Sequence, residues 1–365
     1  MMGDEASAEG AVAAGCRFFA GYPITPTSEL MVHIVKRFEE VGGKFIQMED
    51  EIGSVGAMVG ASWAGGKVMT ATSGPGLSLM MENIGYAAMT ETPMVIVDIQ
   101  RAGPSTGQAT RPGSGDILQV KYGSHGDYEI IALSPWSVQE MYDLTIEAFN
   151  LAEAYRAPVF LLADEGVGHL RENFTVKGEV EVYHRPKAKG LPPFDTGDED
   201  MIPPMPAFGE GEKLLITGST HDEWGYRKTQ VSAVHDRLVK RLVNKIRVNA
   251  GKIHRWEAHF IEDIEYLVVA YGISARAALK TVMDLRKEGI KIGLWRPITI
   301  WPFPEEALKE AAEGVKAVIV PEMNHGQLVR EVERHLSVPV HPIAQVDGEI
   351  MRPETIDIRY LILDI

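Results

Sequence analysis

Residues 48–99 read MEDEIGSVGAMVGASWAGGKVMTATSGPGLSLMMENIGYAAMTETPMVIVDI. Two runs of small or apolar residues at helical spacing, Met48–Gly66 and the run after Ser73, alternate with apolar strand-like runs that end at Thr72 and Ile99. Helices that alternate with such strands are typical of an α/β domain with a mostly parallel, covered sheet. Because Val138–Tyr155 continues the pattern, we expect this domain to occupy residues 1–185.

The second half of the chain resumes the alternation after a break. Residues 186–212 are dense in proline, glycine and charged residues. They show neither the helical nor the strand periodicity of apolar residues, which predicts a linker. We then expect a second, smaller α/β domain over residues 213–345 and a C-terminal segment at 346–365. Its predicted elements are strands at Leu214–Gly218, Tyr266–Gly272 and within IKIGLWR and KAVIVPE, with helices at Val231–Val248 and Ser274–Glu288.

The composition excludes several classes of protein. A formal net charge of −15 and a pI near 5.2 argue against nucleic acid as the main partner, because phosphate binding requires a clustered basic surface. No apolar run approaches the roughly 20 residues that span a bilayer, and the N-terminus lacks a signal-peptide pattern, so we expect a cytoplasmic protein without a membrane partner. The one cysteine, Cys16, cannot supply the roughly four thiolates of a cubane iron–sulfur cluster. Any such cluster is expected on another subunit, and no metal ligand is expected here.

The segment GYPITPTSE, Gly21–Glu29, is a candidate ligand loop. Its two prolines fix φ and remove two backbone donors, so the loop is stiff while Tyr22 and Thr25 are free to face a ligand. The alternative is a strand-to-helix turn capped by Thr27 or Ser28. The residues alone favour neither interpretation.

Three further stretches carry candidate chemistry. Glu51 begins a helix, where the helix dipole favours a carboxylate, so it is either an end-capping charge or a buried acid that faces a cofactor. The SGPG turn, Ser73–Gly76, could cradle an anion at a helix N-terminus, although the lysine of a phosphate loop is missing. The loop Gln100–Asp116 holds Arg101 and Arg111, whose planar guanidinium groups suit a substrate carboxylate or simply the surface.

Six segments together resemble the α subunit of the 2-oxoacid:ferredoxin oxidoreductases, closest to the 2-oxoglutarate type. In family order they are GDEASAEGAVAAGC, GYPITPTSE, EDEIGSVGAMVGASWAG, TATSGPGLSLMMENIGYA, QRAGPSTGQATR and PEMNHGQLVREV. The likeness covers essentially the whole chain. It implies an α/β thiamine-diphosphate-binding fold, in which a pyrimidine-binding domain precedes a domain similar to the C-terminal domain of transketolases.

The resemblance also implies roles for particular residues. Glu51 matches the glutamate that hydrogen-bonds N1′ of the cofactor's aminopyrimidine, a contact that favours the imino tautomer and so helps to remove the C2 proton. Thr25 and Arg111 look like the threonine and arginine that hold the 2-oxoacid, with Arg101 as the reserve candidate and Tyr22 as a further contact. The other expected cofactor contacts are Pro26, Ser73, Gly74 and Asn83.

Further subunits are implied as well. The family's magnesium signature, GDG followed by Asn, is missing from this chain. A β subunit is therefore expected to hold Mg²⁺ and the diphosphate, and thiamine diphosphate would lie between chains. Clusters of the 4Fe–4S type are expected on partner subunits. The expected partners are a γ subunit and, in some enzymes of the family, a ferredoxin-like δ subunit. The implied reaction is oxidative decarboxylation of a 2-oxoacid, with 2-oxoglutarate, coenzyme A and ferredoxin giving succinyl-CoA.

Other functions stay open at this point. The same family acts on pyruvate, branched-chain or indole-type 2-oxoacids, and the β subunit shares that choice. A non-catalytic binding relative is a different class, which the presence of Glu51, Thr25 and Arg111 together opposes. A transketolase-like enzyme independent of ferredoxin would need a magnesium motif or a lipoyl partner, and this sequence indicates neither.

Overall fold

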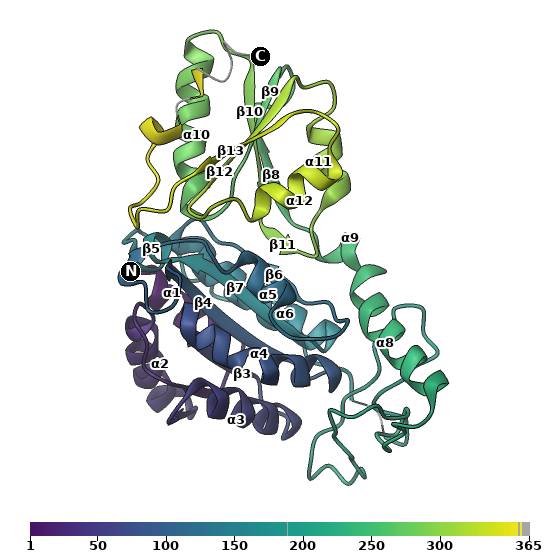
Figure 1. Ribbon diagram of the computed structural model, residues 1–365. Coiled ribbons are helices and arrows are strands. Elements are labelled where there is room, and N and C mark those ends of the chain that lie inside the picture. The colour runs from purple at the N-terminus through teal and green to yellow at the C-terminus, as the bar shows by residue number, and fades with distance from the viewer. Residues whose placement is uncertain (188, 357, 360–365) are drawn as a thin grey trace.

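The computed structural model of the chain describes residues 1–187, 189–356 and 358–359. Figure 1 shows two lobes, a lower one built on an eight-stranded sheet with helices on both faces and an upper one built on a five-stranded sheet. The predicted α/β class is thus confirmed. None of the described helices combines the length and the apolar character needed to cross a membrane.

The larger sheet has the strand order β11-β6-β7-β4-β3-β1-β2, with β5 paired to β4. Its strands β1 to β4, β6 and β7 run parallel, whereas β5 and β11 pair in antiparallel fashion. The central strands are buried along nearly their whole length, as expected for a sheet that is covered on both faces. The strands are β1 (Phe18–Gly21), β2 (Lys44–Gln47), β3 (Val68–Thr72), β4 (Met94–Ala102), β5 (Gln108–Pro112), β6 (Ile131–Leu133), β7 (Pro158–Asp164) and β11 (Thr299–Trp301).

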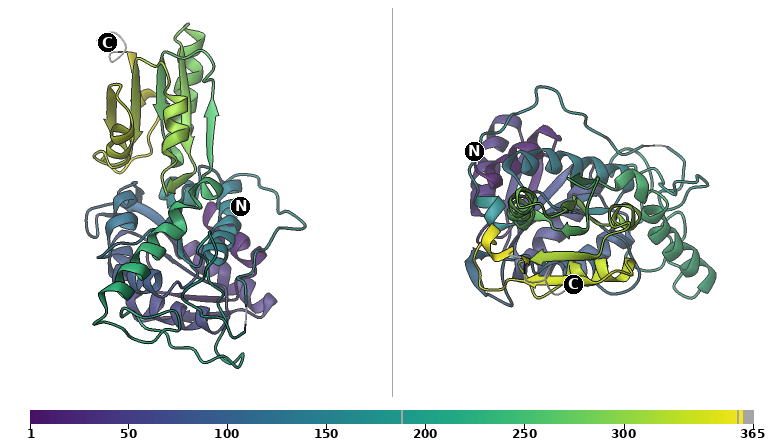
Figure 2. Two further views of the ribbon diagram at one scale, coloured as in Figure 1. Left: turned by 90° about the vertical axis from the view of Figure 1, so that its right-hand side faces the viewer. Right: turned by 90° about the horizontal axis from the view of Figure 1, so that it is seen from above.

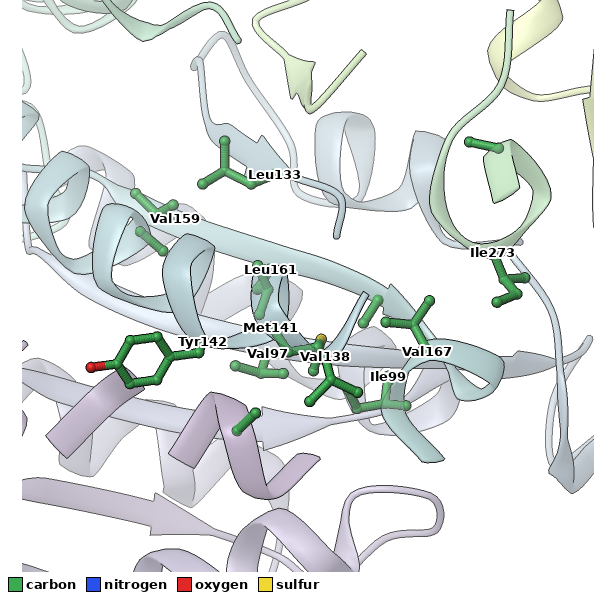
Figure 3. Close-up of a cluster of buried hydrophobic side chains, with 14 of the residues drawn as sticks. Val97, Ile99, Leu133, Val138, Met141, Tyr142, Val159, Leu161, Val167 and Ile273 are labelled. Carbon is green, nitrogen blue, oxygen red and sulfur yellow. The ribbon is translucent and has the colours of Figure 1, made fainter. Parts of the chain in front are cut away.

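Helices cover the two faces of this sheet with separate apolar clusters. One face is packed by α1 (Gly3–Ala13), α2 (Ser28–Val41) and α6 (Val138–Tyr155), and the other by α3 (Glu51–Trp63), α4 (Gly74–Met89) and α5 (Ile117–Tyr122). Figure 3 shows the first cluster, where Val97 and Leu161 of the sheet lie beside Met141 and Tyr142 of α6. Ile273 of the upper lobe belongs to the same cluster, so the two lobes share part of one core.

The chain between the lobes is irregular. After α7 (Glu165–His169), residues 170–231 form no helix or strand in their described part, apart from isolated bridges. The predicted strand at Leu214–Gly218 is therefore wrong. Its apolar side chains pack beside Trp63 and Phe194 instead of joining a sheet. Helices α8 (Ser232–Arg247) and α9 (Ala250–Ile253) follow, to one side of the lower lobe (Figures 1 and 2).

A buried charge network fastens α8 to the lower lobe. Glu91 is 0% exposed and accepts hydrogen bonds from Arg241 Nη1 at 3.0 Å and from Lys245 Nζ at 2.8 Å. Lys245 Nζ also donates to the carbonyl of Arg156 at 2.9 Å. Burial alone would raise the pKa of Glu91, but Arg241, Lys245 and Arg156 more than offset this and hold that pKa well below its usual range. Because α8 is anchored here, we propose that the second domain begins after α9 rather than at residue 213.

The smaller sheet has the order β13-β12-β9-β10-β8, parallel except for β8. The predicted strands and the predicted helix after Tyr266 are found within a few residues of the expected limits. The described part of the predicted C-terminal segment contains a 3-10 turn at Pro353–Ile356, and Asp357 and residues 360–365 lie outside the described residues. The elements are β8 (Trp256–His259), β9 (Tyr266–Val269), β10 (Ile292–Pro297), β12 (Ala317–Glu322), β13 (Val340–Ala344), α10 (Gly272–Lys287), α11 (Glu305–Ala311) and α12 (Leu328–His335).

Candidate active site

Four adjacent parallel strands, β4, β3, β1 and β2, end at one edge of the larger sheet. Ligand sites in open α/β sheets lie outside the carboxyl ends of the strands, so this edge is the expected place for chemistry. Most of the predicted site residues lie in or directly after these strand ends. They are Tyr22, Thr25 and Pro26 after β1, Glu51 after β2, Ser73 and Gly74 after β3, and Arg101 at the end of β4.

Glu51 is a buried acid rather than a helix cap. It is the first residue of α3 and is only 4% exposed. The cap is its neighbour Asp50, whose carboxylate accepts a hydrogen bond from Gly53 N at 2.7 Å. A Cβ atom on Gly76 would lie 2.4 Å from Glu51 Oε1, so the glycine of the SGPG turn makes room for the carboxyl group. Burial raises the pKa of Glu51, and the charge of Asp50 adds to this effect.

The turn that follows β3 offers polar groups without partners. Thr72 and Ser73 are 0% exposed, and among the described residues neither hydroxyl has a hydrogen-bond partner. Gly74 adopts a φ of +31°, which a side chain disfavours, and α4 begins there. The buried carboxyl and these hydroxyls together fit a polar heterocycle.

Asn83 helps to hold the scaffold of this edge. Its Nδ2 donates to the carbonyl of Ile52 at 2.8 Å, which ties α4 to the first turn of α3. This bond fixes the helix that carries Glu51, and the predicted cofactor contact of Asn83 stays a prediction.

The structure brings Arg101, and not Arg111, to the Thr25 loop. Arg101 is 7% exposed, its Nη1 donates to the carbonyl of Thr25 at 2.7 Å, and its buried Nε has no partner in the described chain. Arg101 pairs with Pro112 across the β4–β5 ladder, and the adjacent Arg111 lies where the register of that ladder shifts. The side chain of Arg111 is 53% exposed and pairs with Glu349 at 2.8 Å.

A cleft of about 630 Å³ lies between the lobes beside Arg101. Gly74 and Ser78 of the lower lobe line one part of it, and Asn324 and Gln327 of the upper lobe line another. Asn324 Nδ2 donates to the carbonyl of Ser114 at 2.7 Å, so the PEMNHGQL loop joins the two lobes here. A larger cavity of about 820 Å³ lies between α8 and α12 and contains none of the predicted site residues.

Two buried acids beside this edge were not predicted. Asp98 lies within β4 and Asp116 precedes α5, and the two carboxyl groups interact with each other and with the N–H of Gly74. Burial raises the pKa of both, and a shared proton accounts for two buried carboxyls in contact. The available signal was an acidic residue inside the otherwise apolar run MVIVDI.

Comparisons with known proteins agree with the geometry of this edge. The family described as "Pyruvate flavodoxin/ferredoxin oxidoreductase, thiamine diP-bdg" matches residues 9–241, which include every predicted site residue. The family described as "Pyruvate:ferredoxin oxidoreductase core domain II" matches residues 264–356. The chain belongs to the 2-oxoacid:ferredoxin oxidoreductases. It is a subunit of such an enzyme, with a thiamine-diphosphate-binding domain, and the predicted family is confirmed.

Individual members of the family are similar over nearly the whole oxidoreductase subunit. The 2-oxoglutarate synthase subunit KorA of Methanocaldococcus jannaschii is 52% identical over 98% of this chain and 97% of its own length. The ketoisovalerate oxidoreductase subunit VorB of Methanothermobacter marburgensis is 40% identical over 91% of this chain and 88% of its own.

Solved structures show the same likeness. The 2-oxoglutarate:ferredoxin oxidoreductase from Magnetococcus marinus, with 2-oxoglutarate, coenzyme A and succinyl-CoA bound, matches with a TM-score of 0.91 at 33% identity. The match covers 99% of this subunit but only 64% of that longer chain. A split-gene transketolase, at 16% identity and a TM-score of 0.57, covers 95% of this chain and 88% of its own, and shares the fold alone.

Proposed function

We propose that this chain is the α subunit of a 2-oxoglutarate:ferredoxin oxidoreductase, active only with partner subunits. The reaction is the oxidative decarboxylation of 2-oxoglutarate with coenzyme A to succinyl-CoA and CO₂, with two electrons passing to ferredoxin. The observation that carries the proposal is the buried carboxyl of Glu51 against Gly76, inside the thiamine-diphosphate-binding domain. The relatives named 2-oxoglutarate synthase subunits support the choice of substrate.

Thiamine diphosphate is the cofactor that this edge fits. When bound, it supplies the nucleophilic carbon and the electron sink that decarboxylation of a 2-oxoacid requires. Glu51 would hydrogen-bond the pyrimidine ring and hold or release a proton at its carboxyl, a task that its raised pKa favours. Pro26, Ser73 and Gly74 would line the ring. The diphosphate and Mg²⁺ are assigned to the β subunit, and the iron–sulfur clusters to the γ or δ subunits.

Arg101 and Thr25 are proposed to hold the substrate carboxylate. Arg101 Nε has no partner among the described residues, so this nitrogen and the cleft beside it leave guanidinium N–H groups for an anion, whereas Arg111 is engaged with Glu349 at the surface. Tyr22 is 40% exposed and would contribute at the rim of the site.

The proposal can be tested with the purified complex of this chain and its partner subunits. Turnover is measured with coenzyme A, a viologen acceptor and 2-oxoglutarate, pyruvate, 2-oxoisovalerate or indolepyruvate. We expect the highest kcat/KM with 2-oxoglutarate. A preference for 2-oxoisovalerate would assign the chain to the branched-chain enzymes instead, in line with its 40% identity to the VorB subunit.

Glu51→Gln should lower turnover by about 10² to 10⁴, the usual contribution of a positioned acid–base group. Glu49→Gln, at an exposed acid of the same loop, is the matched control and should have little effect. Gel filtration checks that both variants still assemble. Near-normal turnover of Glu51→Gln would remove Glu51 from the mechanism.

A further inference from the structure

One histidine and three carboxylates lie next to the loop Gly21–Glu29, which carries Thr25 and is called the substrate loop below. His169 and Glu165 belong to α7, Asp4 to the first turn of α1, and Glu29 to the first turn of α2. One side-chain ligand atom from each of Asp4, Glu29 and His169 lies within 4.8 Å of the others. The first two helices of the chain and α7, more than 120 residues later, thus converge on one imidazole ring.

This cluster is short of positive charge. In the part of the chain that the structure describes, none of the three carboxylates pairs with a lysine or an arginine. Asp4 is 0% exposed, and within the described residues its carboxyl group has no donor partner beyond a contact with the backbone N–H of Leu30. Burial raises the pKa of Asp4 well above its usual range, although His169 opposes this. A buried carboxylate costs several kcal/mol unless it is protonated or a cation compensates its charge, and a bound cation would meet this need.

The two ring nitrogens of His169 have different surroundings. Nδ1 lies 3.0 Å from Glu165 Oε1, so Nδ1 carries a proton and donates it to that carboxylate. Nε2 lies 3.1 Å from the carbonyl oxygen of Pro26 and 3.5 Å from Glu29 Oε2. Because both neighbours of Nε2 are acceptors, either a proton or a metal ion occupies its lone pair. A carboxylate on the opposite ring nitrogen is the usual support of a metal-bound histidine.

We propose that Asp4, Glu29 and His169 bind a divalent transition-metal ion, Mn²⁺ or Zn²⁺, with the carbonyl of Pro26 as a further ligand. Three oxygens and one imidazole nitrogen suit these ions better than Ca²⁺ or Mg²⁺, which prefer oxygen ligands throughout. The sequence predicted no metal ligand, because the three side chains are separated by long stretches of chain and only the fold assembles them.

The ion would fix the substrate loop. It would join the first turns of α1 and α2 and the end of α7 to Pro26, the residue directly after Thr25. Its role would be structural, since it holds the backbone that presents Thr25. This consequence rests on the proposed function, whereas binding of the metal does not.

Metal binding is tested on the purified full-length chain after treatment with a chelator. Titration with Mn²⁺, followed by calorimetry and electron paramagnetic resonance, should show one ion per chain, with nitrogen coupling from the His169 ring. Zn²⁺ should displace it, and Mg²⁺ should not. Asp4→Asn and His169→Gln should abolish binding. Glu165→Gln should weaken it about 10- to 100-fold, as is typical of residues that support a metal ligand.

His33→Gln is the matched control, because His33 also faces a carboxylate, Glu9, at 2.7 Å but lies outside the cluster. It should bind Mn²⁺ like the wild type. Circular dichroism checks folding, and Glu29→Gln, at a side chain that is 44% exposed, replaces Asp4→Asn if that variant does not fold. The proposal is overturned if the wild type binds no more Mn²⁺ or Zn²⁺ than the variants do. A doubly protonated His169 in nitrogen NMR of the metal-treated chain would overturn it equally. Neither result depends on catalysis, so the proposed reaction is tested separately.

Discussion

The guanidinium group of Arg101 binds the Thr25 loop through Nη1 and leaves its other N–H groups for a ligand. Nη1 donates to the carbonyl of Thr25 at 2.7 Å, while Nε is buried without a partner in the described residues. This bond aligns the arginine with the loop that carries the threonine. A carboxylate in the adjoining cleft could therefore meet both residues in a fixed geometry, which is the condition for bidentate recognition.

Exchange of Arg101 for lysine should show whether Arg101 or Arg111 binds the substrate carboxylate. Arg101→Lys keeps the charge but loses the planar fork, and a hydrogen bond to a charged group contributes about 1.5 to 3 kcal/mol. We expect the KM for the 2-oxoacid to rise about tenfold or more, with the KM for coenzyme A unchanged. Arg111→Lys, at an exposed ion pair, should leave both values nearly unchanged. A larger effect of Arg111→Lys on substrate KM would reverse the assignment.

At the scale of elements, the periodicity of apolar residues predicted most helices and strands but not how they pack against one another. Helices α3, α4, α6 and α8 lie close to their predicted limits, because each carries a long apolar stripe. The short run Leu214–Gly218 was mistaken for a strand, since an apolar run of this length fits several structures. Glycines at helical spacing in α3 permit close approach of a neighbouring backbone. Within the described chain, however, a Cβ atom on Gly56 or Gly60 would meet nothing within 4 Å.

The sequence predicted those site residues that come shortly after the end of a parallel strand. Glu51, Thr25 and the SGPG turn follow successive strands, so a parallel sheet brings them together. The choice between Arg101 and Arg111 required the register of the β4–β5 ladder, which a single sequence does not supply. The contacts of Asp4 with α7 and of Glu91 with α8 join residues far apart in the chain, which local patterns cannot reveal.

The attachment of α8 should depend on Glu91. Glu91→Gln leaves Arg241 and Lys245 buried without their carboxylate, and loss of one partner from a buried ion pair costs about 3 to 5 kcal/mol. We expect a clearly lower Tm and faster proteolysis of α8. Asp236→Asn removes the exposed partner of Lys240 on the same helix and should change Tm little. Equal Tm values for the two variants would contradict this role of Glu91.

At the scale of the whole molecule, Asp164 fastens the lobes together. Its Oδ1 accepts a hydrogen bond from Val167 N at 2.9 Å in the lower lobe, and its Oδ2 accepts one from Ile273 N at 2.8 Å in the upper lobe. Gly272 has a φ of +55°, and a Cβ atom there would lie 2.6 Å from Asp164 Oδ2. The chain can enter α10 at this contact only because residue 272 lacks a side chain.

The stability of the protein should fall with rising pH because of Asp164. Burial raises its pKa to about 6, above the value of about 3.9 in an unfolded chain. Its favourable contribution is complete below the unfolded pKa and is lost as pH rises through the folded pKa, a change of about 2 to 3 kcal/mol. Asp164→Asn loses one acceptor at every pH but does not titrate. Its deficit in Tm relative to the wild type should therefore shrink between about pH 4 and 7, and a constant deficit would contradict the titration of Asp164.

Strand β11 belongs by sequence to the upper lobe but pairs with β6 of the larger sheet. If the chain were cut between the lobes, β6 would present its unpaired backbone groups to any other extended segment, which invites aggregation. A chain divided at that point is expected to aggregate unless its two parts reassociate. The β6–β11 pair thus makes the larger sheet depend on a strand from the far side of the chain for a closed edge.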